Sequence, residues 1–192
     1  LASAMDGTNG TSLHKRKASD MKHVLFTHDF EKRPGTVFKY SNIPSALLGL
    51  VIEKISGTSL DRLADEKLFR RLAMNRSTFS PEAFPLQEIA PTEIDDWRGI
   101  VHGIVHDESA YICKKENIIV GHAGLFSTAP DILNFLEMLL NKGTLYGEKF
   151  FSEEIVNQMT TNQILDFDDS TGLGWELNQS RYMGKYSTSS TF

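Results

Sequence analysis

The 192-residue chain has a hydrophobic fraction of 40%, a charged fraction of 23% and a net charge of −5 at pH 7. These values suit a globular protein with a packed core, and the scattered Lys and Arg give no electrostatic reason to expect nucleic-acid binding. The single cysteine, Cys113, excludes an intrachain disulfide and a multi-cysteine zinc site. No apolar run approaches the roughly 18 residues that a membrane-spanning helix needs.

Three regions follow one another along the chain. Residues 1–30 are rich in Ser, Thr, Gly, Asn, His and Lys without sustained periodicity, so we predict a polar loop region with a short helix at residues 20–27. Residues 31–165 are predicted to form a helical subdomain. Residues 166–192 are predicted to begin a sheet region that is incomplete within this chain.

The strongest helix signal lies near the start of the second region. Apolar residues recur at the helical period from Ile43 to Ile55, Asn42 is placed to cap the helix, and Gly57 is placed to stop it. Further helices are predicted at Ser59–Leu72, from the cap Thr128 to Gly143, and from Glu153 to about Thr160 after Ser152. Residues 75–120 look irregular, and two strands are predicted at Gly172–Leu177 and Arg181–Tyr186.

The sharpest chemical signal is Tyr40-Ser41-Asn42, where a loop enters the first of these helices. A phenol acts as a base only where a nearby cation stabilises the phenolate, and an amide can donate to a substrate carbonyl and accept from a lysine. Tyr-x-Asn alone also fits a core tyrosine followed by a helix cap. The surrounding sequence therefore decides between the two interpretations.

That surrounding sequence closely resembles serine β-lactamases of the class C type and the related penicillin-binding proteins, D-alanyl-D-alanine peptidases and esterases. The resemblance covers about residues 31–178, in the family's order. The segments that carry it are Pro34–Asn42, Leu47–Glu53, Ser56–Leu60, Leu68–Phe79, Ile89–Glu93, Val101–Glu108, Gly121–Thr128 and Gly172–Trp175. The chain departs from the family's usual Pro-Leu-Gly-Met by having Arg71 and Ala73.

The resemblance implies an α+β fold, an antiparallel sheet flanked by helices plus a helical subdomain, of which this chain supplies mainly the helical subdomain and two C-terminal strands. It implies acyl transfer to water through a serine ester, on a β-lactam, a D-alanyl peptide of peptidoglycan or a small ester, with no metal or organic cofactor. By position, Tyr40 is the implied catalytic base and Asn42 the implied substrate-binding amide. The parent protein is implied to be exported, to the periplasm or cell envelope.

The histidines leave alternatives open. His122 lies between two glycine-bounded turns, where a structural hydrogen-bonding role and a place in the cleft both fit, and we take it as a substrate-binding candidate. His102 and His106 stand four residues apart, as in a metal site. However, Gly103 occupies the position where a His-Glu-x-x-His zinc helix needs its glutamate base, so a metallohydrolase is the weaker alternative.

Two parts of the family's active site are missing from this sequence. The Ser-x-x-Lys matches Ser12–Lys15 and Ser19–Lys22 do not begin an apolar helix and lie closer to Tyr40 than the family arrangement allows, and Lys-Thr-Gly or His-Thr-Gly does not occur. We therefore expect the nucleophile before Leu1 and the last catalytic strand after Phe192. On this expectation the chain alone is inactive and self-associates through exposed apolar surface. A non-catalytic binding or sensor module on the same fold is the alternative function.

Overall fold

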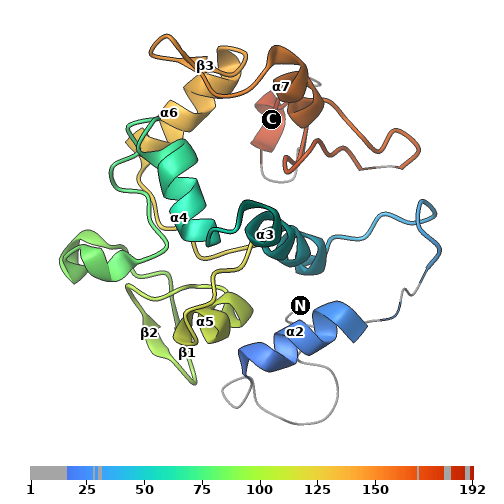
Figure 1. The fold of residues 1–192 in the computed structure, drawn as a ribbon. Helices are drawn as coiled ribbons and strands as arrows, with labels where there is room; N and C mark the ends of the chain where they lie inside the picture. The colour runs from blue at the N-terminus through green and yellow to red at the C-terminus, as the bar shows by residue number, and fades with distance from the viewer. Residues whose placement is uncertain (1–16, 28, 30–31, 168, 180–182, 189–190) are drawn as a thin grey trace. The chain divides into compact units, whose positions relative to one another are not determined.

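The computed structural model describes residues 17–27, 29, 32–167, 169–179, 183–188 and 191–192. They divide into two compact units, one within Leu1–Phe30 and Tyr40–Asp131 and the other within Glu31–Lys39 and Ile132–Phe192. Figure 1 follows the chain from blue to red through its mainly helical elements. The boundaries predicted from the sequence, after residues 30 and 165, stay predictions.

The described residues of the first unit include four complete α-helices and one small hairpin. The helices are α2 (Ala18–Thr27), α3 (Asn42–Ser56), α4 (Leu60–Ala64) and α5 (Glu108–Lys115). A π-helical stretch, Asp65–Phe69, continues α4, and single 3-10 turns lie at Pro81–Ala83 and Leu86–Glu88. Strands β1 (Glu93–Asp95) and β2 (Gly99–Val101) pair antiparallel, with Ile94 opposite Ile100.

Helix α3 forms where the sequence predicts it, but the residue that caps its start is not the predicted one. Ser41, in extended backbone, is the N-cap, and its hydroxyl accepts a hydrogen bond from the Ile43 amide at 3.2 Å. The prediction of Asn42 as the cap is wrong, because Asn42 is already helical. At the other end Gly57 has a φ of 66°, and its amide donates to the Glu53 carbonyl, as expected of a glycine that stops a helix.

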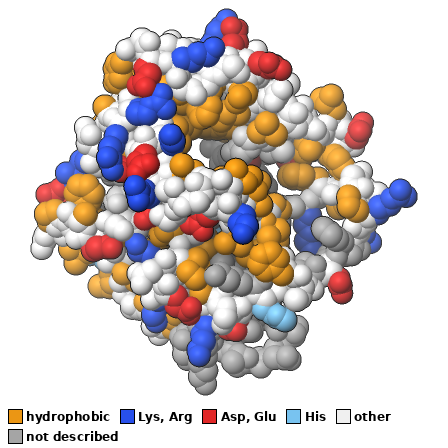
Figure 2. Space-filling model, viewed as in Figure 1, with side chains coloured by type: hydrophobic (Ala, Val, Ile, Leu, Met, Phe, Trp, Pro, Cys, Tyr) orange, Lys and Arg blue, Asp and Glu red, His pale blue; other side chains and the backbone are white. Residues whose placement is uncertain are grey.

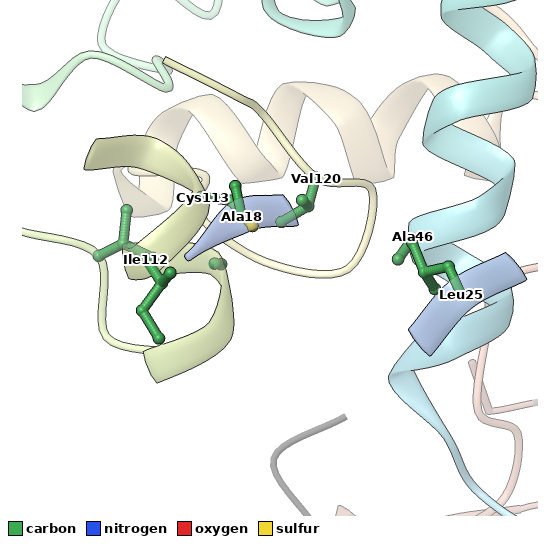
Figure 3. Close-up of a cluster of buried hydrophobic side chains, with 8 residues drawn as sticks. Ala18, Leu25, Ala46, Ile112, Cys113 and Val120 are labelled. Atoms are coloured by element: carbon green, nitrogen blue, oxygen red, sulfur yellow. The ribbon is translucent and has the colours of Figure 1, made fainter. Parts of the chain in front are cut away.

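The core of this unit lies where α2 meets α3 and α5. Ala46 of α3 faces Leu25 of α2, and Ala18 of α2 approaches Cys113 of α5 (Figure 3). The amide of Ala18 also donates to the Glu116 carboxylate at 2.9 Å. Small side chains at these points allow the helices to approach closely, and the lone cysteine is a completely buried core residue.

Helix α5 corrects the prediction that residues 75–120 are irregular. Asp107 caps it by accepting a hydrogen bond from the Ala110 amide at 2.8 Å. Four residues of this short helix are buried: Ser109, Ala110, Ile112 and Cys113. Because the helix has only eight residues, its apolar face shows too few repeats to be evident in the sequence.

Helix α6 (Ala129–Leu140) runs from the first unit into the second. Thr128 accepts a hydrogen bond from the Asp131 amide at 3.4 Å, and Gly143 has a φ of 86°. The second unit continues with the hairpin of β3 (Thr144–Leu145) and β4 (Glu148–Lys149), and with α7 (Glu153–Thr160). The predicted bounds of α7 and its cap Ser152 are confirmed.

The two strands predicted near the C-terminus are not formed in the described part of the chain. Thr171 and Glu176 make a single antiparallel bridge, and Gly184–Tyr186 is a 3-10 helix. Arg181 and Tyr182 lie outside the described residues. A strand needs a neighbour for its alternate amides, and here the segment instead closes on itself, with the Gly172 amide donating to the Trp175 carbonyl at 2.7 Å.

Aromatic packing organises the same segment of the second unit. Trp175 stacks on Phe135 of α6 with ring centroids 6.3 Å apart, and Phe192 meets Trp175 edge-on at 5.7 Å. Such pairs are favourable beyond the area that they bury. The aromatic cluster therefore fixes this segment in place of sheet pairing.

On the molecular face in view, Lys and Arg side chains are interspersed with Asp and Glu, and hydrophobic side chains reach the surface where α3 lies (Figure 2). Leu48, Val51 and Ile55 of α3 are 59%, 48% and 82% exposed. Among the described residues no single helix is long and apolar enough to cross a membrane. Asn42–Ser56 and Leu60–Phe69 meet the length and composition criteria only as a pair, bent by 77°.

Candidate active-site region

Tyr40 and Asn42 lie where the loop enters α3, as the sequence predicts. Tyr40 is 75% exposed as a residue, and its hydroxyl has no hydrogen-bond partner within the part of the chain that the structure describes. Asn42 is half-buried. Because Ser41 supplies the helix cap, the Asn42 amide is not needed for capping.

A pocket of about 410 Å³ lies elsewhere in the first unit, between the 76–92 and 104–128 segments. Its charged lining residues include Arg76, whose guanidinium pairs with Glu88 and lies 4.7 Å from the centre of the Phe84 ring. Gly124 and Leu125 also line the pocket. A mainly apolar pocket of this size with a few polar groups suits a small molecule.

His122 does not project into solvent. Its side chain is 2% exposed, and its Nε2 lies 3.0 Å from the Ser109 hydroxyl and 3.2 Å from Asp107 Oδ1. The Ser109 hydroxyl, on a residue that is 1% exposed, donates to the same Asp107 oxygen at 2.6 Å. The structure thus favours the structural role that the sequence left open for His122, and substrate binding by this side chain stays a prediction.

The environment of Asp107 has opposing effects on its pKa. Partial burial raises the pKa, since it disfavours the charged carboxylate, but hydrogen bonds from His122, Ser109 and the Ala110 amide outweigh burial. The net result holds the pKa of Asp107 well below its usual range. The carboxylate is therefore ionised at neutral pH, and it accepts three hydrogen bonds at one oxygen.

Asp107, Ser109 and His122 contain the residue types of a Ser-His-Asp triad, but their geometry does not fit one. In a triad the two imidazole nitrogens bond separately to the serine and the aspartate. Here Nε2 serves both partners, and the buried Nδ1 has no hydrogen-bond partner among the described residues. The serine donates its proton to the aspartate and is closed off from any acyl carbon, so this network is not a nucleophilic site.

Gly121, which precedes His122, lies directly against α3. A Cβ at Gly121 would come within 2.2 Å of the Ser45 carbonyl oxygen and 3.0 Å of the Gly49 nitrogen. Real Cβ atoms do not approach a backbone so closely, so only glycine permits this contact. Ser45 is one helical turn from Asn42, which joins the His122 segment to the start of α3.

Arg98 fixes the other side of the network. Its side chain is 1% exposed and forms ion pairs with Glu93 and Asp95 of β1. Nη1 donates to the Val105 carbonyl at 3.1 Å and to the His106 carbonyl at 2.8 Å. A planar guanidinium can satisfy all of these acceptors at once, and it thereby positions the backbone immediately before Asp107.

The histidines of the metal alternative are separately engaged. His102 Nε2 lies 2.6 Å from the Ile89 carbonyl oxygen, and His106 Nδ1 lies 3.5 Å from Glu93. In the described segments no group of three or more His, Cys, Asp or Glu could hold a metal ion. Of the two Ser-x-x-Lys matches, Ser12–Lys15 lies outside the described residues, and Ser19 is an exposed residue of α2.

The profile of the family named Beta-lactamase matches residues 3–192, nearly the whole chain. The chain belongs to the β-lactamase family. A relative from Escherichia coli O157:H7, named "Putative D-alanyl-D-alanine carboxypeptidase", is 34% identical over 181 residues, in an alignment that covers 87% of this chain and 41% of that protein. This β-lactamase-family chain therefore spans about two fifths of the length of such relatives.

Solved structures show the same fold. The octameric penicillin-binding protein homologue from Pyrococcus abyssi has a TM-score of 0.63 at 24% identity, over 96% of this chain and 40% of the other. EstCE1, described as a hydrolase with promiscuous acyltransferase activity, has a TM-score of 0.64 at 15% identity, over 98% and 53%. These confirm the predicted serine β-lactamase and DD-peptidase-like fold class.

The sequence did not reveal the network of Asp107, Ser109 and His122 in this β-lactamase-family chain. Asp107 alone has a local signal, because aspartate is a residue type that commonly caps helices and α5 begins directly after it. The contact of His122 with this cap joins segments 13 to 15 residues apart. No local pattern predicts such a contact.

Proposed function

We propose that this chain contributes Tyr40 and Asn42 to the active site of a serine acyl-hydrolase, a D-alanyl-D-alanine carboxypeptidase in the first instance. The observation that carries the proposal is the junction before α3, where Ser41 caps the helix while the Tyr40 side chain is exposed and the Asn42 amide is not used for capping. A core tyrosine followed by a capping asparagine, the alternative that the sequence allows, does not describe this junction.

The proposed reaction has two steps. A serine hydroxyl supplied outside the described residues attacks the acyl carbon, its proton passes to a lysine and Tyr40, and the leaving amine is protonated as the acyl bond breaks. Water then hydrolyses the serine ester with the same groups acting in reverse. Asn42 donates to the acyl-side carbonyl of the substrate and keeps the scissile bond aligned.

The choice of substrate rests on the relatives. The E. coli protein is named "Putative D-alanyl-D-alanine carboxypeptidase", and the solved structures with the same fold include a penicillin-binding protein homologue and a hydrolase with promiscuous acyltransferase activity. We infer a D-alanyl peptide of peptidoglycan as the substrate, with β-lactams as covalent inhibitors and small esters as weaker substrates. The corresponding place of action is the cell envelope.

The test is to express this chain together with the sequence that its gene encodes on either side. Incubation with labelled penicillin and mass spectrometry of the peptides should locate a penicilloyl ester on a serine followed three residues later by lysine. The 192-residue chain alone should give no adduct. A gene product that contains no such serine and binds D-alanyl peptides without turnover would instead support the binding or sensor module. An adduct on Ser12 or Ser19 would contradict the assignment of the nucleophile.

A further inference from the structure

The close approach of Gly121 to α3 links the buried network of Asp107, Ser109 and His122 to the start of that helix. Ser45, whose carbonyl faces Gly121, is one turn from Asn42 and five residues from Tyr40. Glycine at both 49 and 121 leaves no side chain to adjust this contact. The position of the first turns of α3 therefore depends on whatever holds Gly121 in place.

His122, the next residue after Gly121, is itself held by buried bonds. The adjacent imidazole is buried and bonded through Nε2 to both Ser109 and Asp107. Asp107 is fixed as the cap of α5, and the carbonyls of Val105 and His106 before it are fixed by Arg98. The resulting series of contacts runs from the β1–β2 hairpin through α5 to Gly121 and α3. Ser109 and the His122 side chain, which lie within it, are both buried.

We propose that Asp107, Ser109 and His122 form a clamp that sets the position of the Tyr40–Asn42 junction, with His122 as a positioning residue that does not touch substrate. This inference rests on the proposed function, because it assigns the clamp to the same reaction. Catalysis is sensitive to displacements of about 1 Å, which can reduce turnover about a hundredfold. A loosened clamp should therefore lower kcat more than it changes KM.

Two variants of His122 distinguish a clamp that works through its hydrogen bonds from a side chain that only fills space. His122→Leu removes the Nε2 donor, whereas His122→Gln keeps an N–H donor at a similar reach and should restore part of the effect. Ser109→Ala is a milder third variant, which leaves the bond between His122 and Asp107 and serves if His122→Leu does not fold. All are made in the complete gene product.

The first readout is independent of activity. Amide hydrogen exchange of residues 45–49 should accelerate by at least about tenfold in His122→Leu, while exchange of α7 (Glu153–Thr160) stays unchanged as the internal control. The exchange rate of the same residues in His122→Gln should be closer to that of the wild type. Unchanged exchange at 45–49 would overturn the clamp, whether or not the protein is an enzyme.

The second readout is the division between kcat and KM with a D-alanyl peptide. We expect kcat to fall between about tenfold and a hundredfold in His122→Leu, with KM within about threefold of the wild type. Faster exchange with an unchanged kcat would show a structural contact without a positioning role. A large rise in KM with unchanged exchange would show that His122 touches substrate. An inactive wild-type product would refute the proposed function, while the exchange result would still decide the clamp.

Discussion

Gly49 of α3 and Gly121 lie so close that a Cβ at either position would come within about 3 Å of the other residue's backbone nitrogen. Two backbones in direct contact leave no room for adjustment by side-chain rotation, since no side chain is present at either position. The contact therefore makes the start of α3 dependent on a segment more than 70 residues later in the sequence.

Gly121→Ala and Gly49→Ala should each lower the free energy of unfolding by about 1–3 kcal/mol, because each forces a methyl group into backbone atoms. Since both changes disturb one contact, the loss in the double variant should be smaller than the sum of the single losses. Chemical denaturation followed by circular dichroism measures this. Gly57→Ala is the matched control, because open space surrounds that glycine. Its loss of unfolding free energy should add to that of Gly121→Ala. Additive losses for Gly49 and Gly121 would contradict the contact.

Asp107→Asn should reduce stability in a pH-dependent manner. The pKa of Asp107 is lower in the folded than in the unfolded protein, so its contribution is fully present above about pH 4 and is lost as the pH falls through the folded pKa. We expect the variant to be about 1–3 kcal/mol less stable than the wild type at pH 7. The difference should narrow at pH 3. Denaturation at both pH values measures it, with Asp96→Asn as the exposed control, and a difference that does not change with pH would contradict the account.

Arg98→Met should destabilise the first unit by roughly 3 kcal/mol, because it leaves partly buried carboxylates and carbonyls without their donor. Arg62 pairs with Glu66 on the surface, with its side chain 71% exposed, and Arg62→Met should leave the thermal midpoint unchanged. Thermal unfolding of the two variants measures the contrast. Equal shifts for both would show that Arg98 is not the organising residue of the hairpin.

The 192-residue chain alone should self-associate, because α3 presents Leu48, Val51 and Ile55 to solvent. Light scattering after size-exclusion chromatography should give a mass above the 21.6 kDa of one chain. A Val51→Lys, Ile55→Lys double variant should shift this mass toward the monomer. A strict wild-type monomer that unfolds in one sharp transition above about 60 °C would contradict the prediction.

The sequence predicts local features of this protein well, because their causes are local. The period of the apolar residues and the end at Gly57 predict α3, and Ser152 predicts the start of α7. The same reasoning chose Asn42 instead of Ser41 as the cap, since both residue types cap helices and only the backbone conformation decides between them.

Features that depend on distant segments were not predictable. The buried bonds of His122 to Asp107 and Ser109, and the contact of Gly121 with Gly49, exist only once the chain is folded. Apolar residues alternate in the segment near Gly172, as they do in a strand. A strand also needs a neighbouring strand, and the alternation does not show whether one is present. Tyr40 and Asn42 were found because they are adjacent in sequence, and their roles stay predictions.

The central claim is that Tyr40 takes part in proton transfer during acylation of a serine. The most direct measurement is the rate at which the complete gene product forms a penicilloyl ester, followed by mass spectrometry, in the wild type and in Tyr40→Phe. Tyr186→Phe is the matched control, because Tyr186 is also exposed, at 82%. We predict that acylation slows about 10²–10⁴-fold in Tyr40→Phe and is unchanged in Tyr186→Phe. Acylation of Tyr40→Phe at the wild-type rate would contradict the assignment of Tyr40 as the base.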